Sequence, residues 1–262
     1  MTPLPKLMVA PNGARKTKAD HPALPITLDE IIAEAISCYE AGADGLHLHL
    51  RDENGQHVLD AELYKEALAE LRQAVPGMVL QITTEAVGRY TPAQQRAIVE
   101  QVKPEAVSIS LAEMLAGTET SIAVAFYKHC AQAGIAVQHI LYGERDLKLI
   151  SGLLAEGHLE QEELQLLFVL GRYQQDQQST PKDLDIFVEW LHLNCIEPDW
   201  AACAFGLRET ECLSAAHKKG GKVRVGFENS FWNADGSVAS SNAERVVELK
   251  PMAAGLPVKK VS

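Results

Sequence analysis

The sequence predicts an α/β protein with the (β/α)8 architecture of a TIM barrel, forming a single domain over residues 1–262. Short apolar runs alternate with longer amphipathic stretches eight times along the chain. Alternating strands and helices imply a parallel sheet, and eight such units close into a barrel of roughly 250 residues. The first apolar run is not followed by a G-x-G-x-x-G turn, which disfavours the alternative of an open, doubly wound sheet.

The first four units have clear boundaries. Their predicted strands are the apolar runs at residues 6–10, 44–50, 78–82 and 105–111. Their predicted helices are residues 27–41, 60–74, 91–102 and 119–133. Thr27 and Glu30 form a capping box at the start of the first helix, and Gly42 closes it. Pro92 suits the first turn of the third helix, where a missing N–H group costs nothing.

The last four units repeat the same order. Their predicted strands are residues 135–141, 164–170, 199–204 and 222–227. Their predicted helices are residues 144–155, 181–193, 209–218 and 243–253. The polar stretch 171–180 is predicted to be a loop, and Thr180 caps the helix that follows it. Gly157 and Gly220 follow two of these helices and stop them.

Charge and cysteine content argue against several classes of protein. The net charge of −11, from 24 basic and 35 acidic side chains, disfavours a nucleic-acid surface and attraction to anionic membranes. The five cysteines include no C-x-x-C pair, so we expect reduced thiols in the cytoplasm rather than disulfides or a thiolate zinc site. The N-terminus lacks a signal-peptide pattern, and no apolar run approaches the roughly 18 residues of a membrane span.

The strongest functional signal is the sequence HLHLRD at residues 47–52, at the end of the second predicted strand. Side chains on a strand alternate between its faces, so His47 and His49 point the same way and Leu48 points the other way. If the leucines pack against helices, both imidazoles face the barrel mouth and can bind one divalent metal. The alternative is a pair of hydrogen-bonded histidines in a polar core.

A third ligand is predicted at the end of the last strand. Glu228 follows the eighth predicted strand. In a closed barrel the second and eighth strands both flank the first, so Glu228 can face the two histidines across the mouth. Two histidines and a glutamate with an open fourth position form a catalytic zinc arrangement, although Mn, Co or Ni would also accept this set. Otherwise Glu228 is a solvated loop carboxylate. Arg224 shares the strand face of Glu228 and is either an inward cation or the partner of a buried acid.

Other predicted strand ends carry polar residues on the same rim. They are Asn12 and Arg15 after the first strand, Thr83 and Glu85 after the third, Ser108 and Ser110 on the fourth, and His139, Tyr142 and Glu144 on and after the fifth. Each residue alone is more often structural than functional. Together they mark the carboxyl ends of the strands, where barrel active sites gather.

These motifs resemble the β-keto acid cleavage enzyme family, which includes 3-keto-5-aminohexanoate cleavage enzyme. The resemblance rests on a first strand that ends in Gly13-Ala14, on the HLHLRD sequence, on Thr83-Thr84, and on the sequence RVGFE at residues 224–228. These pieces span most of the chain in the family's order. The resemblance implies a TIM barrel with one zinc ion held by His47, His49 and Glu228.

The resemblance also implies an activity. A β-keto acid and acetyl-CoA would give acetoacetate and a new CoA thioester, with the metal acting as a Lewis acid on the β-keto acid's oxygens. The positions that contact substrate in the family correspond here to four residues. They are Arg15, Thr83, Ser108 and Ser110. The remaining catalytic candidates are Arg224, Asn229 and Glu144.

Three positions depart from the family pattern. Asn229 stands where members usually carry an aspartate, and an amide cannot act as a base. The fifth strand lacks the usual acidic end, so Glu144 or Glu85 is the expected base. Arg15 replaces a glutamate suited to an amino group, and its planar guanidinium instead predicts a β-keto acid with an anionic or polar distal end. Alternatively, the Arg15 side chain points into solvent or forms an ion pair with Asp20 or Asp52.

Two other functions remain open from the sequence. The protein can be another metal-dependent barrel lyase or aldolase that acts on a small keto acid, or a metabolite-binding relative without catalysis. Its expected partners are small molecules, a β-keto acid and a CoA ester, with no nucleic acid or membrane. We also expect a homo-oligomer, since the Pro- and Gly-containing tail after Leu249 can reach a neighbouring subunit.

Overall fold

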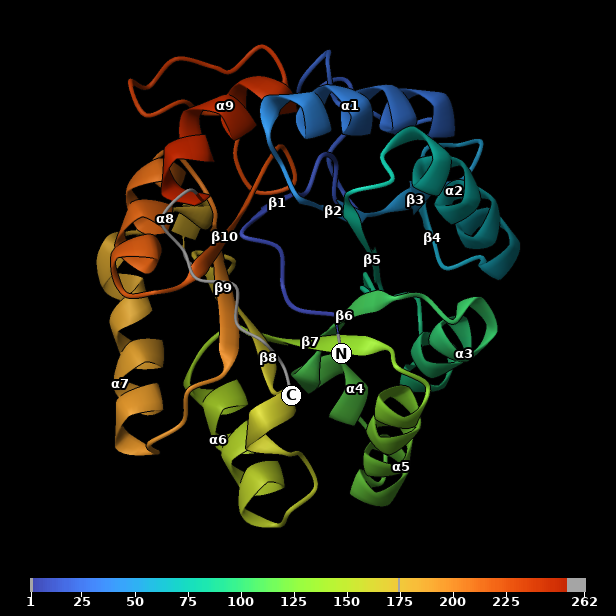
Figure 1. The fold of residues 1–262 in the computed structure, drawn as a ribbon, viewed down its shortest axis with the longest axis vertical. Coiled ribbons are helices and arrows are strands. Elements are labelled where there is room, and N and C mark those ends of the chain that lie inside the picture. Colours follow the sequence, from blue (N-terminus) through green and yellow to red (C-terminus); the bar gives the residue numbers. More distant parts are fainter. Residues whose placement is uncertain (1, 174, 254–262) are drawn as a thin grey trace.

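The computed structural model describes residues 2–173 and 175–253 and contains the predicted TIM barrel (Figure 1). Eight parallel strands close in the order β1-β10-β9-β8-β7-β6-β5-β2. They are β1 (Leu7–Val9), β2 (Gly45–Leu48), β5 (Val79–Thr83), β6 (Ala106–Ser110), β7 (Ala136–Leu141), β8 (Gln165–Leu170), β9 (Asp199–Ala204) and β10 (Lys222–Val225). β1 therefore lies between β2 and β10, as the sequence predicted.

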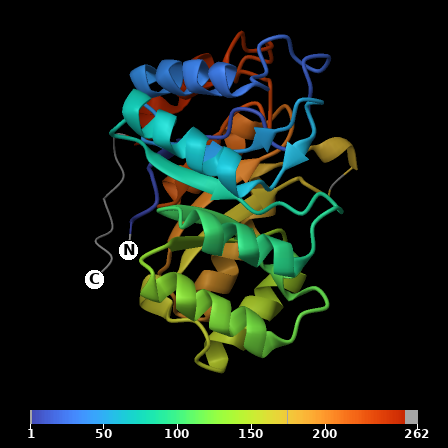
Figure 2. The ribbon, with the colours of Figure 1, turned by 90° about the vertical axis from the view of Figure 1, so that its right-hand side faces the viewer.

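Helices surround the barrel in a ring, and Figure 2 shows them from the side. They are α1 (Leu28–Ala41), α2 (Ala61–Ala74), α3 (Pro92–Val102), α4 (Leu111–Leu115), α5 (Thr120–Gln132), α6 (Glu144–Ala155), α7 (Asp185–Leu193), α8 (Glu209–Lys218) and α9 (Asn242–Ala253). Short 3-10 turns are η1 (Gln161–Glu163), η2 (Gln175–Gln177) and η3 (Pro181–Leu184). The capping box of Thr27 and Glu30 is present, and Gly42 ends α1 with a positive φ.

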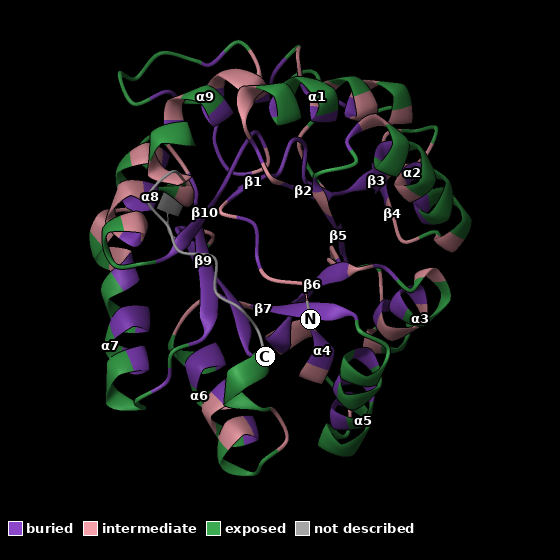
Figure 3. Ribbon diagram, in the orientation of Figure 1, coloured by how far each residue is buried: buried purple, intermediate pink, exposed green. Residues whose placement is uncertain are grey.

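The hydrophobic core has an outer and an inner part. The outer part lies between strands and helices, so the helices are buried on the side that faces the barrel and exposed on the other (Figure 3). The inner part fills the barrel with Leu4, Leu167, Val169, Cys203 and Phe205, among others. The helices in the described part of the chain are too short or too polar to span a lipid bilayer.

Two features differ from the sequence prediction. The second predicted strand does not run to residue 50, because the chain turns away after β2 and forms an antiparallel hairpin of β3 (Leu50–Arg51) and β4 (His57–Val58). The short helix α4 follows β6 directly, with Ser110 as its N-cap. The predicted contact of the tail with another subunit falls largely on residues 254–262, which lie outside the described residues.

Candidate metal centre and active site

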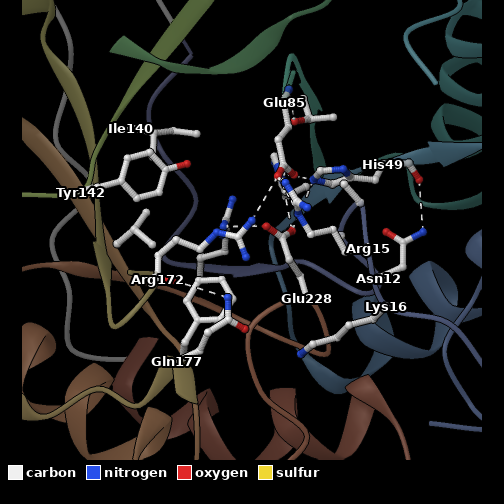
Figure 4. Close-up of a pocket in the computed structure, with 17 residues that line it drawn as sticks. Asn12, Arg15, Lys16, His49, Glu85, Ile140, Tyr142, Arg172, Gln177 and Glu228 are labelled. Carbon is white, nitrogen blue, oxygen red and sulfur yellow. Dashed lines mark hydrogen bonds and ion pairs between the residues drawn. The ribbon is translucent and has the colours of Figure 1, made fainter. Parts of the chain in front are cut away.

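Three predicted ligands meet at the carboxyl ends of the strands. Nε2 of His47 and Nε2 of His49 are 3.1 Å apart, and Oε2 of Glu228 lies 3.6 Å and 3.5 Å from them. Leu46 and Leu48 are fully buried on the opposite face, against the helices, which confirms the alternation argument. The close-up in Figure 4 shows the Glu228 carboxylate directed toward His49. This set could hold one metal ion.

The donor atoms fit a divalent ion. Around a tetrahedral zinc ion with bonds of about 2.0–2.1 Å, neighbouring ligand atoms lie about 3.3 Å apart, which is close to the separations found here. Oε2 of Glu228 is buried and has no hydrogen-bond partner among the described residues. A buried carboxylate oxygen without a partner is costly, and a cation between it and the imidazoles would satisfy it.

Hydrogen bonding and burial set the tautomer and the charge of His47. Its Nδ1 lies 2.8 Å from Oε1 of Gln81, whose amide donates to Oε1 of Gln138. Since the Gln81 oxygen only accepts, Nδ1 carries the proton and Nε2 keeps its lone pair for a metal. Burial lowers the pKa of His47 to about 4 and that of His49 well below its usual value, so both imidazoles are neutral.

Glu228 is placed by a glycine and an arginine. A Cβ atom on Gly13, whose φ is +61°, would lie 2.6 Å from Cγ of Glu228, so a larger residue there would displace the Glu228 side chain. Nη2 of Arg224 donates to Oε1 of Glu228 at 3.1 Å. Burial alone would raise the pKa of Glu228, but the charge of Arg224 and other nearby cations outweighs it and lowers that pKa. The carboxylate is therefore ionised.

The rest of the HLHLRD sequence shapes the neighbouring loop. Nε and Nη2 of Arg51 donate to the carbonyl oxygen of Gly13 at 3.1 Å and 2.5 Å. Asp52 accepts from the backbone N–H groups of Asn54 and Gln56 and forms the turn of the β3–β4 hairpin. Arg51 thus fixes the loop after β1, which carries Gly13 and Arg15.

These groups line an open pocket at the barrel mouth, with a cavity volume of about 120 Å³. Its walls include four basic side chains and two acidic ones. The basic side chains are Arg15, Lys16, Arg172 and Arg224, and the acidic ones are Glu85 and Glu228. The pocket is therefore electropositive, although the whole chain carries a net charge of −11.

Glu85 lies after β5, the strand that pairs directly with β2 and its histidines. Its Oε1 is 3.4 Å from Nη2 of Arg172 and 3.9 Å from Nε of Arg15. Burial and the negative charge of Glu228 raise the pKa of Glu85 to about 7, and the charge of Arg172 opposes this rise. At neutral pH this carboxyl group therefore exists in both protonation states.

Residues 6–259 match the model of the beta-keto acid cleavage enzyme family. The chain belongs to this family. The family assignment agrees with the resemblance carried by the HLHLRD and RVGFE sequences.

Relatives of this family match nearly the full chain. It is 29% identical over 249 residues to a 3-keto-5-aminohexanoate cleavage enzyme of Acetoanaerobium sticklandii, covering 92% of this chain and 88% of the relative. It is 24% identical over 267 residues to a 3-oxoadipate:acetyl-CoA acetyltransferase of Cupriavidus necator, covering 98% and 91%. The solved structure of ObcA superposes with a TM-score of 0.69 at 17% identity. The superposition covers 89% of this chain and 64% of the ObcA chain, and it shows that the two share a fold.

Several residues predicted from the sequence line the pocket of this family member. Arg15, Thr83 and Arg224 join the three candidate metal ligands there. The side chain of Arg15 is 60% exposed and approaches Glu85 rather than Asp20 or Asp52. Thr83 accepts a hydrogen bond from the backbone of Glu85. Part of the rim expected from the sequence therefore lines the pocket, with Asn12, Glu85 and Tyr142 among it.

Other predicted residues lie outside the pocket wall. Ser108 is buried beside Thr83 in register, and Ser110 caps α4, but neither lines the pocket. Asn229 is buried, and its side chain has no hydrogen-bond partner among the described residues. Glu144 is exposed as the first residue of α6 and does not reach the pocket.

The expected place of His139 on the inner rim is wrong. Its neighbour Gln138 points into the barrel and bonds to Gln81, so alternation turns His139 outward. There its ring packs edge-on against Tyr127 of α5, with centroids 4.8 Å apart.

Two basic pocket residues were not found from the sequence. Arg172 follows β8, and its guanidinium lies 5.3 Å from the centre of the Phe205 ring. Lys16 donates from Nζ to the carbonyl oxygen of Phe227 at 2.7 Å, and burial lowers its pKa to about 8. The signal for Arg172 was its place directly after Gly171 at a strand end, inside a stretch interpreted only as a polar loop.

Proposed function

We propose that this protein is a zinc-dependent acyltransferase. It would combine a β-keto acid with acetyl-CoA and give acetoacetate and a new acyl-CoA. The observation that carries this proposal is the pairing of His47, His49 and Glu228 at the mouth of a barrel of this family. The names of several relatives, including 3-oxoadipate:acetyl-CoA acetyltransferase, support the acetyl-CoA-dependent reaction.

The three ligands would hold the ion and leave a position open. In that position the ion would act as a Lewis acid on the oxygens of the β-keto acid. Arg224 holds the Glu228 carboxylate in place and adds a buried positive charge to the pocket floor. Of the proposed hydroxyl contacts, Thr83 lines the pocket and is the best placed to bind substrate. Ser108 and Ser110 do not line it, so they would have to contribute through the residues that do.

The substrate class follows from the charges around the mouth. Arg15 and Arg172 both approach a single carboxylate, Glu85, so their donors exceed the acceptors present. A substrate carboxylate can accept two parallel hydrogen bonds from a guanidinium group. We therefore propose a β-keto acid whose distal end is anionic, such as a keto-diacid, with Arg15 as a contact at that end.

The test is a screen on metal-replete protein. Several β-keto acids, including 3-oxoadipate, are incubated with acetyl-CoA, and acetoacetate is measured. We expect acetoacetate only when both substrates are present and the metal has not been removed by a chelator. Turnover without acetyl-CoA would instead favour a lyase, and no turnover of any β-keto acid would reject the activity.

The metal is tested separately on the purified protein. Elemental analysis is expected to find about one zinc ion per chain in the wild type and a loss of it in the His47→Ala/His49→Ala double variant. Retention of the metal in the double variant would show that these histidines do not bind it. Because this readout does not use activity, it stands whatever the substrate is.

A further inference from the structure

The proposed reaction needs a group that removes a proton from carbon, and the pocket restricts the choice. Its described wall carries two carboxylates, Glu85 and Glu228. Glu228 faces both histidines and accepts from Arg224, so it is committed to the metal site. Nζ of Lys16 donates to a backbone carbonyl and lies 4.2 Å from the ring centre of Phe231.

The remaining titratable groups on the wall are poor bases. The two histidines are the candidate metal ligands, and burial raises the pKa of Tyr142 well above its usual value. Arginine side chains stay protonated in proteins. Among the described residues of the pocket wall, Glu85 is the carboxylate left free for proton transfer.

Glu85 is fixed in a position that suits this role. Its backbone N–H donates to Oγ1 of Thr83 at 3.0 Å, and its carbonyl oxygen lies 3.1 Å from Nε2 of His57 on the β3–β4 hairpin. Figure 4 shows its side chain entering the pocket and pointing toward Arg172 and Arg15. The carboxylate therefore lies in the pocket that the candidate metal ligands also line, with Arg172 and Arg15 close to it.

We propose that Glu85 is the general base that takes the proton from C2 of the β-keto acid, the carbon between its ketone and its carboxylate. This inference rests on the proposed function for its substrate. The electron pair of the broken C–H bond attacks the carbonyl carbon of acetyl-CoA, and the coenzyme A thiolate leaves. The thiolate then attacks the substrate ketone, and the bond from that carbon to C2 breaks.

The atoms balance in this sequence. The original acyl group leaves as its CoA thioester, and C2 with its carboxylate and the acetyl group leaves as the acetoacetate carbanion. Glu85 returns its proton to that carbanion, so no outside acid, oxidant or reductant is needed. Burial raises the pKa of Glu85 above that of an exposed carboxyl group, which favours its taking up and returning a proton.

The experiment follows hydrogen exchange at C2 of 3-oxoadipate in D2O by NMR, with zinc-loaded protein and no acetyl-CoA. Exchange at C4, beside the same ketone, is the internal control. We expect the wild type to speed exchange at C2 above the buffer rate. Glu85→Gln is expected to lower that enzyme-dependent rate by at least about 100-fold. Glu85→Asp keeps a carboxylate and should retain part of it.

A control variant and a zinc measurement make the result specific. Glu66→Gln changes an exposed carboxylate on α2 and should exchange like the wild type. Zinc content is measured in each variant and should stay unchanged in Glu85→Gln, because Glu85 is not a ligand. If Glu85→Gln does not fold, a C2 exchange rate in Glu85→Asp that is lower than in Glu66→Gln but above the buffer rate, at unchanged zinc content, provides the same test.

The outcomes separate this inference from the proposed function. Wild-type exchange in Glu85→Gln, no enzyme-dependent exchange in the wild type, or loss of exchange in Glu144→Gln instead would each overturn the assignment of Glu85. A wild type that exchanges C2 through Glu85 but makes no acetoacetate from acetyl-CoA would overturn the proposed function and leave the base assignment standing.

Discussion

Gly13 is the residue on which the position of Glu228 depends most directly. It adopts a φ of +61°, and a Cβ atom would lie 2.6 Å from Cγ of Glu228. Its carbonyl oxygen also accepts two hydrogen bonds from Arg51. The Gly13-Ala14 turn and the HLHLRD sequence therefore serve the metal site together, one by leaving room and the other by anchoring the loop.

Gly13→Ala should weaken zinc binding by about 10- to 100-fold, because it displaces a ligand. The matched control is Gly134→Ala, where φ is +72° but no atom lies within 4 Å of the new Cβ. Both variants should lose about 1–2 kcal/mol of stability from the left-handed backbone. Competition with a chelator measures the zinc affinity, and equal affinities in the two variants would contradict the contact argument.

Arg15 is expected to select the charge of the substrate's distal end. The wild type should prefer 3-oxoadipate over 3-keto-5-aminohexanoate, and Arg15→Glu should shift the ratio of kcat/KM values by about ten-fold or more toward the amino substrate. The expected change in the kcat/KM ratio is at the low end of the range for a charge-assisted contact, because the Arg15 side chain is 60% exposed. Lys148→Glu, an exposed change on α6, makes the same charge change away from the pocket. An unchanged ratio in Arg15→Glu would remove Arg15 from the specificity account.

The sequence could predict the candidate ligands but not two of the basic residues of the pocket. His47, His49 and Glu228 follow from strand alternation and from the closure of the barrel, which are regular features. Arg172 and Lys16 lie in irregular loops, whose paths depend on contacts such as those with Phe205 and Phe227. No periodicity in the sequence encodes such contacts.

At the scale of elements, the strand and helix order was predictable and the short elements were not. Eight apolar runs and eight amphipathic stretches were each long enough to show their period. β3 and β4 have two residues each, so the alternation that identifies a strand cannot develop. The predicted second strand consequently ran on to Leu50, although Leu50 and Arg51 turn away to form the β3–β4 hairpin.

The amino ends of β9 and β10 are joined by a buried ion pair. Nζ of Lys222 lies 2.8 Å from the Asp199 carboxylate and donates to the carbonyl oxygen of Leu4, whose N–H donates to Asp199. This cluster fixes the N-terminal segment at the end of the barrel opposite the candidate metal centre.

Lys222→Met should lower the free energy of unfolding by about 3–5 kcal/mol, because it leaves the Asp199 carboxylate buried without its cation. Urea denaturation measures this loss. The double variant Asp199→Asn/Lys222→Met should recover much of the stability, and zinc affinity should not change in either. A loss below about 1 kcal/mol in the single variant would show that water already reaches the pair.

For the whole molecule, the barrel explains how distant segments form one site. The candidate ligands come from β2 and from the chain after β10, which are far apart in sequence but both flank β1. An acidic protein with an electropositive pocket is also suited to drawing anionic substrates into that pocket. The closed order of strands was predictable from the number of units, whereas the position of each loop over the mouth was not.

In the proposed reaction, the acetyl group of acetyl-CoA becomes part of acetoacetate. The measurement is ¹³C NMR of the products after zinc-loaded protein has acted on 3-oxoadipate and acetyl-CoA labelled at its carbonyl carbon. The account predicts the label at C3 of acetoacetate and an unlabelled new acyl-CoA. Label that stays in acetyl-CoA or appears in acetate, while 3-oxoadipate is consumed, would contradict it.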